Sequence, residues 1–158
     1  RITLKKKKVN LPDLLEHLHI QLTPRALREE IDFQIKYEGA DTFLYTDEDR
    51  LKQVFINLLD NAFKFTAPGG RVSLQAVADN EQLYFYITDN GCGIPPEELP
   101  HVKEKFFKGK SSKSQSGIGL SLADEIIRLM KGKLEIASQV GQGTQVTITL
   151  PREAVSEK

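Results

Sequence analysis

The sequence predicts a two-layer α/β (α+β) sandwich in which about three helices cover one face of a mixed, largely antiparallel sheet. Three observations predict it. Segments with the period of an amphipathic helix are interleaved with about six segments in which apolar and polar residues alternate. Some strand segments follow one another closely enough to form antiparallel hairpins. One helical segment is apolar around most of its circumference, as expected for a helix packed beneath a sheet.

Length and composition exclude several functional classes. The chain has 158 residues, the size of one domain, and its 22 basic and 22 acidic residues balance. No global field therefore attracts nucleic acid or a membrane surface. The single cysteine, Cys92, excludes an internal disulfide, and three scattered histidines argue against a zinc site. We expect a cytoplasmic domain in a reducing compartment, while membrane anchoring of the parent protein stays open.

The start of the chain is basic. Because the chain opens on Arg1, residues 1–8 are interpreted as the end of a linker from an upstream domain, with an acidic partner for Lys5 to Lys8 as the alternative. The domain itself is expected at residues 9–151, and residues 152–158 as a tail. Asn10 as N-cap, Pro12 and leucines at helical spacing then predict a helix that Thr23-Pro24 kinks or interrupts.

The central helix is predicted at residues 46–66, after short strands at 31–36 and 42–45. Thr46 or Asp47 can cap its start, and Thr66 to Gly70 ends it. A narrow polar stripe interrupts its apolar surface, with two amides one turn apart and a lysine beyond them: Arg50, Gln53, Asn57, Asp60, Asn61 and Lys64. This pattern favours ligand binding, and a solvated stripe on an ordinary amphipathic helix is the alternative.

A hairpin of residues 72–78 and 83–87 leads to Asp89 in the sequence D-N-G-C-G-I. Alternation places Asp89 on the same face as Phe85 and Ile87, where a carboxylate needs hydrogen-bond donors. Gly91 and Gly93 remove side chains beside it, which suits the close approach of a flat ligand. A tight turn after a strand is the alternative.

Residues 97–116 lose this periodicity and become basic, with five lysines around Phe106-Phe107. They predict a mobile loop with an aromatic anchor, or else a plain solvated loop. Gly117-Ile118-Gly119 then opens a periodic helix that reaches Met130, and its free N–H groups can face an anion. Two strands, at 133–137 and 144–150, close the chain around the turn at 140–143.

Together these pieces describe a nucleotide pocket. A rim carboxylate with glycines receives a base, amides offer oxygens to hydrated magnesium, and lysines and a helix start receive phosphates. The glycine patterns of the Walker A and Rossmann phosphate loops are absent from the sequence. No Ser/His/Asp or Cys/His set indicates a covalent nucleophile.

Five motifs occur in a characteristic order: N-L-L-D-N-A-F-K-F at 57–65, D-N-G-C-G-I at 89–94, K-F-F-K at 105–108, G-I-G-L-S-L at 117–122 and G-Q-G-T at 141–144. With them, residues 9–151 resemble the catalytic and ATP-binding domain of sensor histidine kinases. These kinases belong to the Bergerat-fold ATPase superfamily of DNA gyrase, the MutL proteins and the heat-shock chaperone ATPases. The resemblance implies that ATP and Mg²⁺ are the cofactors and that the chain is a histidine protein kinase.

The resemblance also implies roles for individual residues. Asp89 accepts the adenine amino group near Thr144, Asn61 binds magnesium, and Asn57 and Lys64 are the catalytic residues beside the phosphates. Hydrolytic relatives carry a general-base Glu where this chain has Asn57, which fits transfer rather than hydrolysis. Residues 97–116 form the ATP lid, anchored by Phe106 and Phe107. The remaining pocket residues are Phe65, Gly91, Gly93, Ile94, Phe107, Lys108, Gly117, Ile118, Gly119 and Leu120.

Phosphoryl transfer requires an acceptor outside this chain. H-I-Q-L-T-P at 19–24 only faintly resembles an acceptor box, so His17 and His19 are interpreted as helix-surface residues. The expected partners are an upstream dimerisation and histidine phosphotransfer domain, a response regulator receiver domain and a second copy of the parent protein. An anti-sigma-factor type serine kinase and a non-catalytic ATP-sensing domain are the alternatives.

Overall fold

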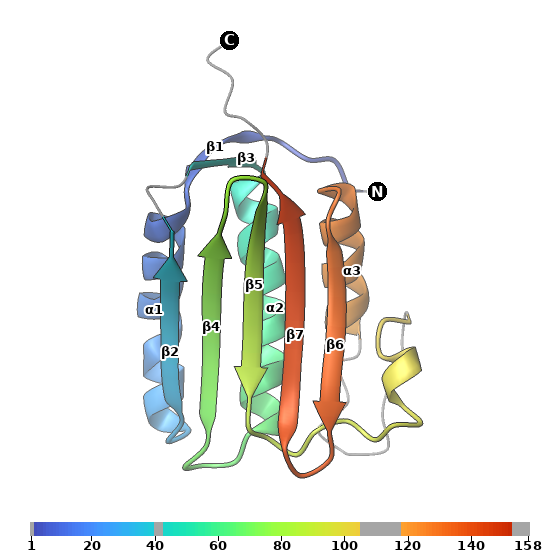
Figure 1. Cartoon of the computed structure of the whole chain (residues 1–158). Helices are drawn as coiled ribbons and strands as arrows, with labels where there is room; N and C mark the ends of the chain where they lie inside the picture. The colour runs from blue at the N-terminus through green and yellow to red at the C-terminus, as the bar shows by residue number, and fades with distance from the viewer. Residues whose placement is uncertain (1, 40–42, 105–117, 153–158) are drawn as a thin grey trace.

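The computed structural model describes residues 2–39, 43–104 and 118–152. Three α-helices lie on one face of a five-stranded sheet in this part of the chain, so the predicted two-layer sandwich is confirmed (Figure 1). The elements in chain order are β1 (Lys7–Asn10), α1 (Leu11–Arg28), β2 (Asp32–Glu38), β3 (Phe43–Thr46), α2 (Glu48–Phe65), β4 (Arg71–Ala78), β5 (Gln82–Asp89), the 3₁₀ helix η1 (Leu99–His101), α3 (Ile118–Leu129), β6 (Lys133–Gln139) and β7 (Gly143–Pro151).

The strand order of the main sheet is β2-β4-β5-β7-β6. The β2–β4 pair is parallel and the other three pairs are antiparallel, which confirms the prediction of a mixed, largely antiparallel sheet. Strand β5 is central, and its last residue, Asp89, lies opposite Val72 of β4 and Thr144 of β7. Asp89 therefore stands at the end of the most enclosed strand.

Strands β1 and β3 form a separate two-stranded sheet, with Val9 opposite Leu44. The predicted mixed sheet thus contains five of the described strands, and β1 and β3 lie outside it. Figure 1 shows this small sheet lying across one end of the sandwich. Strand β3 runs directly into α2, so its chain must cross toward the helix layer. Val9 and Leu44 are buried and close that end of the core.

Residues 2–8, which the sequence suggested as the end of a linker, lie against the domain. Ile2 and Leu4 pack on the core, and the backbone N–H of Lys5 donates to Oδ2 of Asp47 at 2.8 Å. The ammonium of Lys7 lies 3.0 Å from the carboxylate of Glu48. The incoming chain is thus attached to the start of α2.

Helix α1 continues through Pro24, so of the kink or interruption expected at Thr23-Pro24 the interruption is absent. Pro24 removes the N–H that would bind the carbonyl of Ile20. Ile20 is exposed, so water can reach this part of the helix surface. The N-cap follows the prediction, since the side chain of Asn10 accepts from the N–H of Asp13 at 3.0 Å.

Helix α2 forms the centre of the core. Asp47 caps its start by accepting the N–H of Arg50, and the ring of Phe55 contacts that of Phe85 at 4.9 Å between centroids. Full burial of each large apolar side chain stabilises the fold by about 1.5–3 kcal/mol. Its buried residues are Leu51, Val54, Phe55, Leu58, Leu59, Ala62 and Phe63, and its polar stripe stays partly exposed. The amphipathic pattern predicted for residues 46–66 is confirmed.

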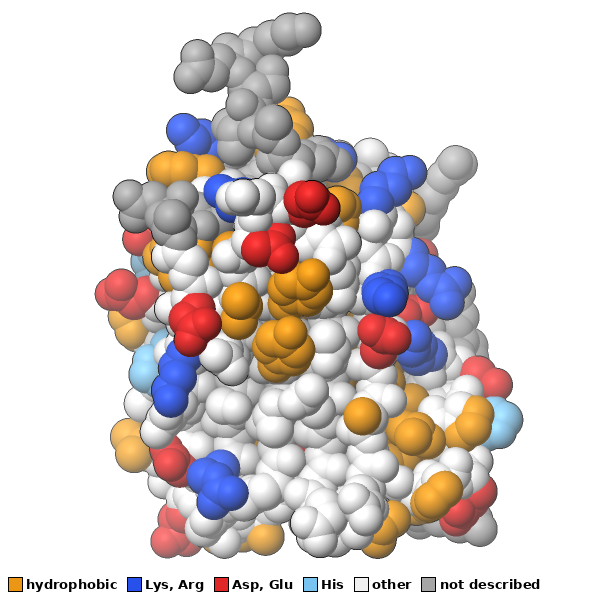
Figure 2. All heavy atoms as spheres, viewed as in Figure 1, with side chains coloured by type: hydrophobic (Ala, Val, Ile, Leu, Met, Phe, Trp, Pro, Cys, Tyr) orange, Lys and Arg blue, Asp and Glu red, His pale blue; other side chains and the backbone are white. Residues whose placement is uncertain are grey.

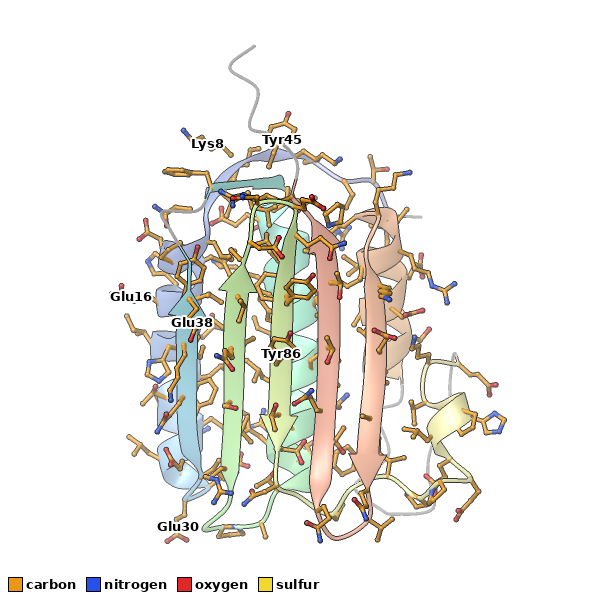
Figure 3. All side chains as sticks on the ribbon, viewed as in Figure 1. Lys8, Glu16, Glu30, Glu38, Tyr45 and Tyr86 are labelled. Carbon is orange, nitrogen blue, oxygen red and sulfur yellow. The ribbon has the colours of Figure 1, made fainter. Side chains whose placement is uncertain are left out.

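The opposite face of the sheet is not covered by a helix of the described chain (Figure 1). Figure 2 views this face and shows apolar side chains gathered in its upper part, with mostly uncharged surface below. Tyr86 projects from β5 on this side, and its ring stacks with that of Tyr84 at 6.5 Å between centroids (Figure 3). Among the described helices, none is both long and apolar enough to cross a bilayer.

The first part of the predicted mobile loop is packed. Residues 99–101 form η1, and Val102 is buried. The ammonium of Lys103 donates to the carbonyl of Leu134 at 2.5 Å and lies 3.3 Å from the carboxylate of Asp124 on α3. Residues 99–103 are thus packed although their sequence lacks periodicity, and the mobility expected for residues 97–116 stays a prediction. Residues 105–116 lie outside the described chain.

Candidate functional site

A small cavity lies between α2, α3 and the end of the sheet that carries Asp89. Its volume is about 40 Å³. Three of its lining residues are polar and come from three different elements, namely Asn61, Asp89 and Thr144. Its lining is otherwise apolar: Leu58, Ala62, Phe65, Ile87, Ile94, Leu120, Ile136 and Val146. Six residues predicted for the nucleotide pocket line it: Asn61, Phe65, Asp89, Ile94, Leu120 and Thr144.

Asp89 lies in an environment that disfavours the charged form of its carboxyl. The residue is 9% exposed. Burial raises the pKa of its carboxyl, and backbone hydrogen bonds from Gly91 and Thr144 lower it in part. The bond from the Gly91 N–H to Oδ1 is 2.8 Å long. A carboxylate with a raised pKa at the wall of an apolar cavity is a group that a hydrogen-bond donor on a ligand would stabilise.

The loop after β5 is fixed by close backbone packing. A Cβ on Gly91 would overlap the carbonyl oxygen of Phe65, and one on Gly93 would overlap that of Gln139. Gly93 also has φ +77°, a conformation that favours glycine. The N–H of Cys92 donates to the Phe65 carbonyl at 3.0 Å. The close approach that we expected for a ligand is thus made by the chain itself at both glycines.

Ser138, which the sequence analysis missed, connects the elements around the cavity. Its hydroxyl accepts the N–H of Ile94 at 2.7 Å, donates to the carbonyl of Gly143 at 3.0 Å and lies 2.8 Å from the hydroxyl of Thr144. Alternation along β6 places Ser138 on the same face as Leu134 and Ile136. A polar residue on that inward face was the signal that could have identified it.

The polar stripe of α2 reaches the cavity through Asn61. Asn57 and Lys64 share the stripe but do not line the cavity. The ammonium of Lys64 lies 3.2 Å from Oδ2 of Asp60. Among the described residues there is no group of three or more His, Cys, Asp or Glu side chains that could hold a metal ion.

Several predicted site residues lie wholly or partly outside the described part of the chain. Phe107, Lys108 and Gly117 lie outside the described residues, as does Phe106. Ile118 and Gly119 belong to the first turn of α3, and only their backbone is described. The start of this helix is nevertheless close to the cavity, because Leu120 lines it.

A larger hollow of about 460 Å³ lies on the open face of the sheet. Strand side chains that point away from the helices line it, including Gln34, Arg71, Gln75 and Thr88. Asn61, Thr144 and Leu120 are not among its lining residues. Asp89 lines both spaces, and we assign the site to the smaller cavity because Asn61, Thr144 and Leu120 accompany Asp89 only there.

The described histidines lie apart from the cavity lining. His17 is exposed on α1, whereas His19 is half-buried with its ring centroid 5.2 Å from that of Phe33. His101 lies beside Glu104, with Nδ1 and Oε2 3.0 Å apart. The interpretation of His19 as a plain surface residue therefore needs adjustment, since it packs against β2.

Comparison of the sequence with protein families finds a match at residues 46–154 to the family described as histidine kinase-, DNA gyrase B- and HSP90-like ATPase. The adaptive-response sensory kinase SasA of Synechococcus elongatus is 34% identical over 148 residues, which is 92% of this chain and 38% of SasA. The sensor histidine kinase YclK of Bacillus subtilis is 30% identical over 98% of this chain and 33% of YclK. The chain thus spans less than two fifths of the length of these relatives.

Solved structures show the same fold. The mycobacterial sensor histidine kinase MprB has a TM-score of 0.79 and 28% identity, and the match covers 96% of this chain and 100% of that one. Full-length ShkA in complex with AMPPNP has a TM-score of 0.84 and 26% identity, covering 98% of this chain and 33% of ShkA. The agreement over nearly the whole chain shows that the described architecture is a recurrent one.

Proposed function

The chain belongs to the family of histidine kinase-, DNA gyrase B- and HSP90-like ATPases, and from this we propose that it positions Mg-ATP for transfer of the terminal phosphoryl group to a histidine on a separate domain. Two relatives that match over more than nine tenths of this chain are named adaptive-response sensory kinase and sensor histidine kinase. These names favour the histidine kinase over a serine kinase or a domain that only senses ATP.

The observation that carries the proposal is the environment of Asp89. Its carboxylate stands at the end of the central strand, lines the cavity together with Thr144, and is held by the N–H of Gly91. The adenine amino group is a donor that suits this acceptor, and the flat apolar surfaces of Phe65, Ile94 and Leu120 suit the ring. Guanine, with a carbonyl at the same ring position, would place acceptor against acceptor.

The chain has a donor set that fits magnesium delivered by a nucleotide. Mg²⁺ keeps several waters and takes one or two protein oxygens beside substrate phosphates, so an acidic cage is unnecessary. The amide oxygen of Asn61, half-buried at the cavity, would supply such a ligand. When bound, the ion would neutralise charge on the phosphate oxygens.

The polar stripe of α2 provides the remaining groups. Asn57 lies one turn before Asn61, and Lys64 lies one turn after it. Asn57 carries an amide, which cannot accept a proton from water as a carboxylate would, so this position favours transfer over hydrolysis. Lys64 carries a cation toward the phosphates. Residues 105–117, including Phe107, Lys108 and Gly117, are proposed to complete the phosphate side.

The proposed partners follow because this chain positions ATP and another domain supplies the acceptor histidine. A histidine-bearing dimerisation domain would present the acceptor, and a response regulator receiver domain would take the phosphoryl group from it. The parent protein would act as a homodimer, and ATP supply places the domain in the cytoplasm. The residues proposed to form the catalytic domain are 9–151, preceded by the end of a linker.

Labelled ATP tests the proposal. With Mg²⁺ and ATP labelled at the terminal phosphate, the chain alone should stay unlabelled, and the parent's histidine-bearing domain added in trans should gain acid-labile label. Transfer should be slow, because docking of separate domains is no longer intramolecular. Label on the chain itself that disappears in His19→Ala would contradict the proposal, as would rapid phosphate release without any acceptor.

A further inference from the structure

The cation proposed to meet the phosphates is already engaged on the far side of its helix. The Lys64 ammonium lies 3.2 Å from Oδ2 of Asp60, one turn earlier on α2. The other oxygen of Asp60 accepts a 2.5 Å hydrogen bond from Nη1 of Arg25 on α1. Arg25 also donates to Glu29 at 2.7 Å and lies 5.1 Å above the ring centroid of Phe63. Four charged side chains thus connect α1 to the polar stripe of α2.

Helical geometry places Lys64 between Asp60 and Asn61 around the axis of α2. At 100° per residue, Lys64 is displaced by about 40° from Asp60 and by about 60° in the opposite sense from Asn61. Asn61 lines the cavity, whereas Asp60 and Lys64 do not. A flexible lysine side chain can therefore turn toward Asp60 and α1, or toward Asn61 and the cavity.

Building on the proposed function, we propose that Asp60 holds Lys64 on the α1 side of α2 and competes with nucleotide phosphates for it, and that Arg25 sets the strength of this competition. Asp60 and Arg25 are positioning residues in this scheme, since they act through Lys64 and make no contact with the nucleotide. An ionised Asp60 shared by two cations holds each of them less strongly than it would hold one.

The electrostatics of the cluster support an ionised Asp60. Burial alone would raise the pKa of its carboxyl, but hydrogen bonds and charges from Arg25 and Lys64 hold the pKa below its usual value. The side chains of Lys64 and Asp60 are 38% and 35% exposed, so solvent screens their attraction. The competition must therefore be weak, and a magnesium nucleotide can win it.

Nucleotide titrations of the whole chain test the scheme. Asp60→Asn should bind Mg-ATP about two- to fivefold more tightly, as expected for release of an exposed ion pair. Arg25→Gln should bind it more weakly by a similar factor, because Asp60 then holds Lys64 alone. Glu29→Gln removes another carboxylate bound to Arg25 and should change affinity less than twofold. Adenosine, which lacks phosphates, should bind equally to all four proteins.

A Lys64→Met background separates this mechanism from general repulsion between Asp60 and phosphates. The effects of Asp60→Asn and Arg25→Gln should both vanish there. An Asp60→Asn effect that persists without Lys64 would overturn the inference. If Asp60→Asn does not fold, as judged by circular dichroism, the cycle between Arg25→Gln and Lys64→Met measures the same coupling. If the wild type binds ATP but the cycles show no coupling of Asp60 or Arg25 to Lys64, this inference alone is refuted. If the wild type does not bind ATP, the proposed function is refuted as well.

Discussion

The backbone N–H of Gly91 donates a 2.8 Å hydrogen bond to Oδ1 of Asp89, so the loop after β5 closes onto the last side chain of that strand. The bond orients a buried carboxylate before any ligand arrives. It offsets only part of the cost of burial, because the pKa of Asp89 remains raised. A hydrogen-bond donor on a ligand can offset the remaining cost of burying the carboxylate, so ligand binding would stabilise the charged form of Asp89.

The first prediction concerns recognition of adenine. Asp89→Asn should weaken Mg-ATP binding by about 1.5–3 kcal/mol, since a hydrogen bond to a charged acceptor is lost. Isothermal titration calorimetry measures the change. Asp32→Asn removes a carboxylate from the open face of the sheet and should leave the affinity unchanged. Equal affinity of the wild type for ATP and GTP would contradict the role given to Asp89.

The second prediction concerns pH. Because burial raises the pKa of Asp89 in the folded chain above its ordinary 3.8, the folded state holds this proton more tightly than the unfolded state. The wild type should therefore lose free energy of unfolding, relative to Asp89→Asn, as pH rises from about 4 through the raised pKa. Above that pKa the difference should be constant. Urea unfolding of both proteins at several pH values tests this, and a wild-type free energy of unfolding that rises relative to that of Asp89→Asn over this pH range would refute it.

The third prediction concerns magnesium. A nucleotide at 100 times its dissociation constant should stabilise the fold by roughly 2.7 kcal/mol, which raises the melting temperature. Asn61→Ala should remove most of the extra shift that magnesium adds to ATP, while the shift with ATP and EDTA should persist. Gln53→Ala, two turns earlier on the same stripe, serves as the control. An unchanged magnesium effect in Asn61→Ala would exclude this amide as a ligand.

The fourth prediction concerns the loop at Gly91. A methyl group there would overlap the Phe65 carbonyl oxygen, so Gly91→Ala should lower the free energy of unfolding by about 1–3 kcal/mol. Gly69 has open space around it but φ +91°, so Gly69→Ala measures backbone strain without overlap. We expect Gly91→Ala alone to weaken ATP binding, because it displaces Asp89. Equal effects of both variants on binding would contradict the packing argument.

Patterns within single elements predicted much of this fold. The apolar period of α2, the capping by Asp47 and the alternation that places Asp89 on the inward face are local properties of the sequence. Asn61, Asp89 and Thr144 share a cavity although 83 residues separate the first from the last, and the motif resemblance anticipated this arrangement. The roles assigned to these residues stay predictions.

Features that depend on contacts between elements could not be predicted from patterns within single elements. Gly91 was interpreted as space for a ligand, but its neighbour is the Phe65 carbonyl, which only the packing of α2 on the β5 loop brings there. The separate β1–β3 sheet depends on where the chain enters α2. The spacing of Asp60 and Lys64 was visible as an i, i+4 pair, but the contribution of Arg25 from another helix was not.

The most direct test of the account is a crystal structure of this chain with Mg²⁺ and a non-hydrolysable ATP analogue. We expect the adenine amino group within hydrogen-bond distance of the Asp89 carboxylate, the ring between Phe65 and Leu120, and the magnesium ion bound to the Asn61 amide. The cavity, now about 40 Å³, must widen to admit the base. A nucleotide found instead in the open-face hollow beside Arg71 and Gln75 would contradict the account.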